Sequence, residues 1–456
     1  MLIDCFCANV AQIPIFVFKP LTGTQKTSNL KSFMNKPATC FQLLNFYIFL
    51  ALSFVLFSCG SPEKELSEFS DTMDLEVFNP LDRERSDVMV YMNEKDLLSK
   101  YPNFNAKGFV VKNGEMEIPS QYNDKGHEIG IVFVLPFIGP KETMSIQIAY
   151  HSENEISRDY PKLTQAELSH KVDGHFENRV YMGGTFQNVD ELHVPAEHTD
   201  HSWFIRYEGP GWESNKVGYR FYLDWRNGVD VFGKKVPEPI LQRVGHDNFD
   251  SYHDMSDWGM DVLKVGSSLG VGSIATFIDG QAKRVDVTDS LYAAVRNNGP
   301  VYSSIETKYY GWDLGDSKTT ITSNLSIHSG TRLSKQMLNS SDEIGNFATG
   351  LIKDQKAEVM TGGEGLAFEY LATYGPQSLA EDKLGIAVIY PSAQKMELTQ
   401  DKHSHIVVLK PESNTITYYF LAAWEQEKGG IQDKESFKIY MDQVVEELSN
   451  PLVVTF

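Results

Sequence analysis

Cysteine is scarce in this chain and confined to one end. The four cysteines are Cys5, Cys7, Cys40 and Cys59, and the 397 positions after Cys59 contain none. The rest of the chain therefore has no disulfide, no cysteine nucleophile and no zinc–thiolate cluster. A folded body in this part of the chain must form without disulfides.

Positive charge is also in short supply. The chain has 41 Lys and Arg against 61 Asp and Glu, a formal net charge of -20. A nucleic-acid partner needs a concentrated basic surface, so this balance argues against one. An anionic ligand would have to be held by a local cluster of Arg and Lys. The sequence also lacks a G-x-S-x-G elbow, a phosphate-binding loop and a dinucleotide fingerprint, which argues against esterases, kinases and nicotinamide enzymes.

The first 59 residues are typical of an export signal. Met34 could be the true start; Lys36 supplies a positive charge and residues 41–58 an apolar run. The run ends Leu-Phe-Ser before Cys59, which resembles a bacterial lipobox. Cys59 would then be acylated, residues 60–73 would form a tether, and the body would be an exported lipoprotein at the outer membrane or in the periplasm. The alternative is an uncleaved membrane anchor.

The remainder predicts a mostly β fold. Short β-branched and aromatic runs, separated by Gly, Pro, Asn and Asp, begin at residue 74. They predict a small β-sandwich over 74–150, a linker over 151–175 with a short helix capped by Thr164, and a large antiparallel sandwich over 176–456. The apolar spacing in 434–449 predicts one good helix that packs on a sheet.

Residues 246–272, HDNFDSYHDMSDWGMDVLKVGSSLGVG, have neither strand nor helix periodicity and read as a long loop. Long loops inside compact domains are usually functional or disordered. This one carries Tyr252, His253 and Lys264 and is expected to be ordered. The alternatives are a loop that faces a ligand and a loop that only bridges two sheets with its polar groups in water.

The segment 193–201, HVPAEHTDH, has three histidines and two carboxylates in nine residues. These groups suit a divalent metal such as zinc or manganese, although the spacing misses the zincin patterns and Pro195 forbids a helix interior. The segment could instead present one catalytic histidine, for which His198 is the candidate, or be a solvated loop. A divalent metal is thus possible, but no cofactor is firmly predicted.

A third set of polar and aromatic residues lies between 206 and 224. Strand alternation places Arg220 and Tyr222 on one face and Tyr219 on the other. A guanidinium can grip a sugar carboxylate in a bidentate fork, and Trp212 could stack on the sugar ring. Arg206, Arg220, Trp212 and Tyr222 are therefore candidate binding residues; the alternative is ordinary alternation on a surface strand.

The chain resembles a Bacteroidetes family, the domain of unknown function 4861. The matching pieces include EIPSQYND near 117, Arg206 six residues before Trp212-Glu213, GVDVFGKKVPEPI, YHDMSDWGMDVLKVGSSLGVG and YYFLAAWEQE, and the resemblance spans about residues 75–456. Where many members have Cys-Gly-Gly or Gly-Gly, this chain has Val271-Gly272-Ser273. Where many have Trp-Glu-Asn-Asp, it has Trp212-Glu213-Ser214-Asn215.

The resemblance implies a β-supersandwich like that of galactose mutarotases and several polysaccharide lyases, and a carbohydrate-processing activity from a polysaccharide-utilisation locus. Within the family it points to the oligosaccharide dehydratase of ulvan breakdown. That activity removes water across C4–C5 of a non-reducing-end glucuronic or iduronic acid, in an oligosaccharide that also carries sulfated rhamnose. The product is a 4,5-unsaturated uronate.

This chemistry requires cations around the carboxylate, a base for the C5 proton and an acid for the C4 hydroxyl. We expect Arg206 and Lys264 to hold the carboxylate, with Arg220 as a weaker candidate. Tyr252 and His253 would act as base or acid, with His198 as competitor; in an extended loop, neighbouring side chains point apart, so at most one of the first two is expected to be catalytic. Alternatives are a polysaccharide lyase, a non-catalytic surface glycan-binding lipoprotein and a glycosidase.

Overall fold

The computed structural model describes residues 68–247, 249 and 251–456. The predicted signal, lipobox and Cys59 lie outside the described residues. No helix within the described part is long and apolar enough to cross a membrane. The chain is mostly β, as predicted, with helices α2 (Glu94–Lys100) and α3 (Lys434–Ser449) in the described ranges.

The first β-sandwich is built from two sheets formed by residues 71–150 together with residues 453–455. Alternating apolar residues such as Leu75, Ile131 and Ile148 face inward from two sheets and make a separate buried core. The last strand of the chain joins this sandwich by pairing with its first strand. In spatial order the sheets are β29 (Val453–Thr455), β1 (Asp71–Phe78), β7 (Thr143–Tyr150), β3 (Phe109–Asn113) and β4 (Met116–Ile118), and β2 (Arg85–Asn93), β6 (Gly130–Ile138) and β5 (Ser120–Asn123).

The expected linker helix is wrong. Residues 164–167 form strand β8 (Thr164–Glu167), which pairs with β12 (Gly211–Ser214) as the edge of a five-stranded sheet. The next residues form a hairpin of β9 (Ser169–Glu177) and β10 (Val180–Asn188). Thr164 donates its hydroxyl to the carbonyl of Gly299 instead of capping a helix. Tertiary pairing overrides a local helical pattern here, so the large β region begins near residue 164.

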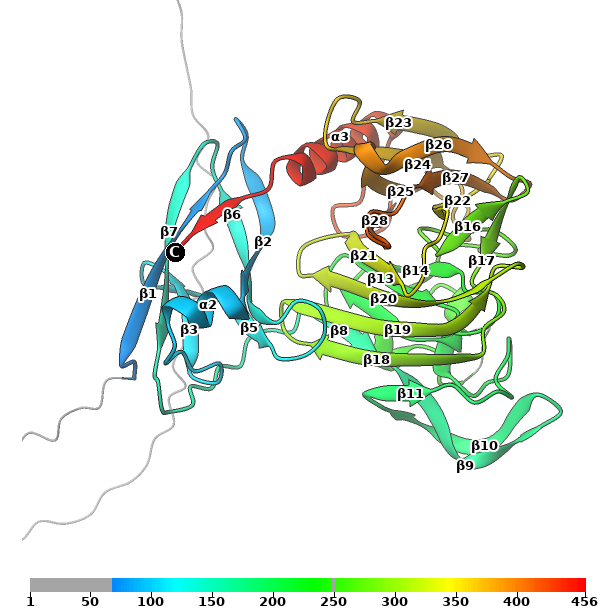
Figure 1. The fold of residues 1–456 in the computed structure, drawn as a ribbon, viewed down its shortest axis with the longest axis horizontal. Coiled ribbons are helices and arrows are strands. Elements are labelled where there is room, and N and C mark those ends of the chain that lie inside the picture. The colour runs from blue at the N-terminus through cyan, green and yellow to red at the C-terminus, as the bar shows by residue number, and fades with distance from the viewer. Residues whose placement is uncertain (1–67, 248, 250) are drawn as a thin grey trace, which may run out of the picture. The chain divides into compact units, whose positions relative to one another are not determined.

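The large β region contains three sheets around one core, and the long strands β18 to β21 lie side by side in Figure 1. The nine-stranded sheet has the order β11 (Glu191–His193), β18 (Ser290–Asn298), β19 (Tyr302–Asp313), β20 (Lys318–His328), β21 (Leu333–Ser340), β28 (Thr415–Trp424), β25 (Leu384–Pro391), β24 (Phe368–Gly375) and β23 (Glu358–Gly362). One five-stranded sheet has the order β15 (Gly259–Asp261), β14 (Val229–Lys234), β13 (Val217–Phe221), β12 and β8. The other has the order β17 (Gln281–Arg284), β16 (Ala275–Ile278), β22 (Phe347–Ile352), β27 (Ser404–Leu409) and β26 (Lys395–Gln400).

Helix α3 also forms as predicted. Asp433 caps it by accepting from the backbone N–H of Ser436, and Phe437, Met441 and Val445 are buried along one stripe. This stripe packs on β23 and β24, and Figure 1 shows the helix beside these strands. The helix thus covers the sheet and supplies none of the candidate site residues.

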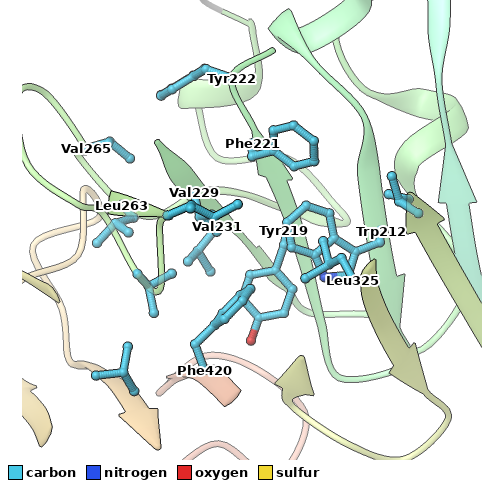
Figure 2. Packing of buried hydrophobic residues seen from close by; sticks show 14 of the residues in the cluster. Trp212, Tyr219, Phe221, Tyr222, Val229, Val231, Leu263, Val265, Leu325 and Phe420 are labelled. Carbon is cyan, nitrogen blue, oxygen red and sulfur yellow. The ribbon is translucent and has the colours of Figure 1, made fainter. Parts of the chain in front are cut away.

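Trp212 lies in the core and not on a sugar-binding loop, which corrects one expectation. Its ring is 1% exposed and stacks on Tyr219 at 5.5 Å, next to Phe420 (Figure 2). Its indole N–H donates to the hydroxyl of Ser334, 2.8 Å away. A ring so enclosed cannot stack on a substrate. It stabilises the packing of the five-stranded sheet that contains β12 against the nine-stranded sheet.

Candidate active site

The centre of the candidate site is a buried guanidinium. Arg220, on β13, is 1% exposed. Its Nη1 donates to the phenol oxygen of Tyr252 at 2.8 Å and to the carbonyl of Tyr207 at 3.1 Å. Its Nη2 donates to Asp230 and to Asp261, each at 2.8 Å. Each of these partners comes from a different segment, so the guanidinium ties β14, β15 and two loops to one point.

Two carboxyl groups meet at Nη2 of Arg220. Asp230 also accepts the hydroxyl of Tyr222 at 2.7 Å, and Asp261 accepts the backbone N–H of Leu263 at 3.1 Å. Burial, followed by the charge of Asp230, holds the pKa of Asp261 well above its ordinary value. The guanidinium of Arg220 thus lies between two buried carboxyl groups and offsets their charge.

Alternation along β13 works as the sequence predicts, but neither face of the strand meets solvent. Tyr222 is 8% exposed and follows Arg220 onto Asp230, while Tyr219 points into the core. Arg220 and Tyr222 are thus committed to protein partners. Both side chains are buried and already bound by protein groups, which corrects the expectation that they face outward to grip a sugar.

Tyr252 and His253 occupy a short 3-10 turn, η3 (Ser251–His253), and not an extended loop. Their rings are 4.7 Å apart, and both approach the network of Arg220. Tyr252 is 2% exposed, and burial raises the pKa of its phenol to about 12. The His253 side chain is 43% exposed, with Nε2 3.5 Å from Oδ2 of Asp261. His253 is therefore the more exposed of the two residues, and Tyr252 is buried beside it, bound to Arg220.

The second part of the candidate site is a loop, residues 201–208, whose backbone is strained. Four non-glycine residues adopt positive φ: His201 (56°), Trp203 (55°), Tyr207 (38°) and Glu208 (69°). Such conformations cost on the order of 1–3 kcal/mol each and concentrate at functional sites. The loop is held by Gly209, where any side chain would collide with the carbonyl of Phe221. Backbone strain therefore marks residues 201–208 independently of their side chains.

Glu208 links this loop to the buried guanidinium. Its carboxylate lies 3.7 Å from Nη1 of Arg220 and accepts from Nη2 of Arg226 at 2.6 Å. Nδ1 of His201 lies 3.9 Å from Glu208 and 3.7 Å from Asp200, and the His201 side chain is 65% exposed. The adjacent cations lower the pKa of Glu208, although its burial opposes them. His201 and His253 therefore lie at two ends of one continuous buried network, each beside a carboxyl group.

His198, the alternative candidate for the catalytic base or acid, is mostly buried. Its Nδ1 shares a hydrogen bond of 2.8 Å with the hydroxyl of Ser202. Burial lowers the pKa of His198 from 6.5 to about 4. His198 is therefore neutral at physiological pH and a weak base, and His201, three residues on, takes the exposed place.

This shift predicts a pH-dependent stability. Between about pH 6.5 and 4 the unfolded chain binds a proton at His198 while the native chain does not, so the free energy of unfolding falls as the pH falls. At most about 3 kcal/mol depends on this group. In His198→Gln the difference between urea midpoints at pH 7 and pH 4.5 is expected to shrink. His193→Gln, at an exposed position of β11, is the control. An unchanged difference in His198→Gln would contradict the assignment.

Arg206 is not free to bind a carboxylate from outside. It is 2% exposed, pairs with Glu167 of β8 and contacts His246 through Nη1. Burial lowers its pKa. Glu167 also accepts the hydroxyl of Tyr207 at 2.8 Å. The expected substrate-binding role is therefore wrong: Arg206 fastens the strained loop to β8.

Two other cations, Lys264 and Arg284, have no carboxylate partner among the described residues. Lys264 is exposed and makes no ion pair with any residue the structure describes. Arg284, at the end of β17, is half-buried and donates to the carbonyls of Gly266 and Ser268 at 3.4 and 3.0 Å. Arg284, too, has no carboxylate within 4 Å among the described residues. Burial lowers its pKa, and the charges of Asp224 and Arg226 also act on that pKa. The segment 264–268 thus contains one cation, Lys264, and binds a second, Arg284, through two backbone carbonyls.

No group of three or more His, Cys, Asp or Glu side chains is arranged to hold a metal ion, as far as residues 68–247, 249 and 251–456 go. In the segment 193–201, His193 packs at 4.8 Å from the ring of Tyr292, His198 turns to Ser202, and His201 turns to Glu208. The three histidines point to three different partners, so this segment is not a metal centre in the structure.

The fold and these contacts describe a mostly β protein with a buried ion-pair network around Arg220 and two exposed histidines, His201 and His253, beside it. The chain belongs to the family described as a domain of unknown function (DUF4861), whose model matches residues 77–454. A similar protein is the Uncharacterized protein P7 of Formosa agariphila. It is 24% identical over 436 residues, which cover 89% of this chain and 98% of that protein.

Solved structures with a similar arrangement include two from Enterococcus faecalis. One is a protein in the glycosyl hydrolase family 38, with a TM-score of 0.39, 9% identity and coverage of 84% of this chain. The other is an alpha-mannosidase, with a TM-score of 0.41, 8% identity and coverage of 85%. The chain spans about half the length of each, 47% and 46%.

Proposed function

We propose that this protein is a carbon–oxygen lyase that removes water across C4–C5 of a uronic acid at the non-reducing end of an oligosaccharide. The observation that carries the proposal is the pair of exposed histidines, His253 beside Asp261 and His201 beside Glu208, on one network around Arg220. Imidazole titrates near neutral pH and can take or give a proton. A carboxyl group behind each ring fixes its orientation.

The elimination assigns one task to each exposed group. Arg284 and Lys264 neutralise the uronate carboxylate and hold the enolate-like charge that develops there. His253 takes the proton from C5 as the C5–H bond breaks. The C4–O bond then breaks, a C4=C5 double bond forms, and the hydroxyl leaves as water with a proton from His201. Exchange with solvent returns both histidines to their starting states.

The buried groups support this step without taking part in it. Arg220 and Asp261 hold the turn that carries His253, and Tyr252 is locked to Arg220 by its phenol oxygen. Preorganised positioning of this kind accounts for much of enzymatic rate enhancement. If the segment ending at Cys59 is a lipoprotein signal, the reaction takes place on a lipid-anchored protein outside the cytoplasm.

The test is incubation with glucuronate- and iduronate-terminated oligosaccharides, including sulfated rhamnose-containing ones from ulvan, read by mass and ultraviolet absorbance together. The proposal predicts a single product lighter by one water that absorbs as an unsaturated uronate. Two fragments, one of them absorbing, would instead indicate cleavage by a polysaccharide lyase. Two non-absorbing fragments that have gained one water would indicate a glycosidase, and binding without any product a glycan-binding protein.

A further inference from the structure

Trp225 is an exposed aromatic ring beside the candidate site. It lies in the turn between β13 and β14 and is 50% exposed, unlike the core residue Trp212. A single exposed apolar side chain is ordinary on a protein surface, so Trp225 is distinguished by how its ring is held and by what lies beside it. An indole face of this kind packs well on the apolar face of a sugar ring.

The ring is anchored by its edge. Its Nε1 donates to Oδ1 of Asp200 at 3.2 Å. Asp200 also accepts from the hydroxyl of Thr199 at 2.9 Å and lies 3.7 Å from Nη2 of Arg179. Arg179 is at the tip of the β9–β10 hairpin and donates to Thr199 at 2.7 Å. Two other segments, the turn with Trp225 and the hairpin tip with Arg179, thus meet at Asp200, and the indole loses little conformational entropy when a ligand stacks on it.

The same carboxylate connects Trp225 to the proposed chemistry. Oδ2 of Asp200 is 3.7 Å from Nδ1 of His201, so Trp225 and His201 flank one group. The next residue, Arg226, pairs with Glu208 and lies 4.1 Å over the ring of Tyr222. Arg226 therefore connects this turn to Glu208 and Tyr222, while Trp225 presents its indole ring at the surface.

We infer that Trp225 forms a second sugar subsite, which binds the residue next to the reacting uronate. The substrate class is then an oligosaccharide of two or more sugars and not a free uronic acid. Arg179, whose side chain is 72% exposed, lies at the edge of this subsite. This inference rests on the proposed function for the location of the reacting sugar.

The test compares Trp225→Ala and Trp225→Phe with wild-type protein on glucuronic acid, a glucuronate-terminated disaccharide and a tetrasaccharide. For the two longer substrates Trp225→Ala is expected to raise KM about tenfold, with kcat within about twofold, because stacking contributes to binding and not to the chemical step. Trp225→Phe keeps a ring and should recover most of the affinity. Phe137→Ala, which removes another exposed aromatic ring at 46% exposure, is the matched control.

Binding of the same three sugars, measured by saturation-transfer NMR and titration, separates this inference from the proposed function. Chain-length-dependent binding that Trp225→Ala weakens supports the subsite even if no sugar is turned over, in which case only the proposed reaction fails. Equal binding by Trp225→Ala and wild type overturns the subsite, as does an equal loss for the monosaccharide and the tetrasaccharide. Thermal melts confirm that both variants are folded.

Discussion

His253→Gln is expected to lower kcat on a uronate-terminated oligosaccharide by about a hundredfold to ten-thousandfold, the usual contribution of a positioned general base. Glutamine keeps the polarity and approximate reach of the imidazole but cannot accept the C5 proton. Because the His253 side chain is 43% exposed, the fold is expected to tolerate the change. The measurement is initial rate from the absorbance of the unsaturated product.

Two controls isolate the effect. His175→Gln, at a side chain 73% exposed on β9, should leave kcat unchanged. Tyr252→Phe removes a buried hydroxyl that accepts from Arg220, so it should reduce stability by about 1 kcal/mol and leave the shape of the pH–rate profile as in wild type. Undiminished turnover in His253→Gln would remove His253 from the mechanism. A changed pH profile in Tyr252→Phe would make that phenol a participant.

Arg220→Met is expected to reduce the free energy of unfolding by about 3–5 kcal/mol, the usual effect of removing one partner from a buried ion pair. Methionine has similar volume, but it leaves Asp230 and Asp261 facing each other at 1% and 0% exposure without their cation. Both carboxyl groups would have to be protonated, so the loss should grow with rising pH. Urea denaturation at pH 5 and pH 8 measures it.

A matched surface pair provides the comparison. Arg243 donates to both oxygens of Asp257, and the two side chains are 46% and 74% exposed. Arg243→Met should therefore change stability by no more than about 1 kcal/mol. Adding Asp230→Asn and Asp261→Asn to Arg220→Met should recover part of the stability. A loss for Arg220→Met as small as that for Arg243→Met would show that the buried network is not a structural centre.

Local patterns in the sequence were enough for most of the fold. Short β-branched and aromatic runs between turn residues predicted a mostly β chain and many of its strands, and the spacing of Phe437, Met441 and Val445 identified α3. Alternation also placed Arg220 and Tyr222 on one face of β13. It did not show that this face is buried, since that depends on Asp230 and Asp261 arriving from β14 and β15.

The predictions were wrong where contacts between residues distant in sequence determine the structure. The segment of β8 has a helical pattern, but pairing with β12 makes it a strand. Trp212 looks like a loop residue until Ser334, 122 positions later, encloses it. Arg206 looks available until Glu167 pairs with it. In each case the partner is distant in sequence, and no local pattern contains it.

The site residues that were missed had weak signals in the sequence. The turn with Trp225 and Arg226 joins two antiparallel strands, β13 and β14, and no local pattern shows that it also presents an indole and a cation. In HVPAEHTDH no local pattern shows which ring is exposed: the His201 side chain is 65% exposed, whereas burial lowers the pKa of His198. The 3-10 turn at η3 places Tyr252 and His253 near one network, where an extended loop would have separated them.

The central claim is that His253 removes the C5 proton of a uronate while its C4 hydroxyl departs. The most direct measurement is the mass of the product formed from a uronate-terminated oligosaccharide that carries deuterium at C5. The account predicts that the product has lost the deuterium together with the hydroxyl, and that this loss disappears in His253→Gln. A lighter product that retains the deuterium, or equal loss in the variant, would contradict it.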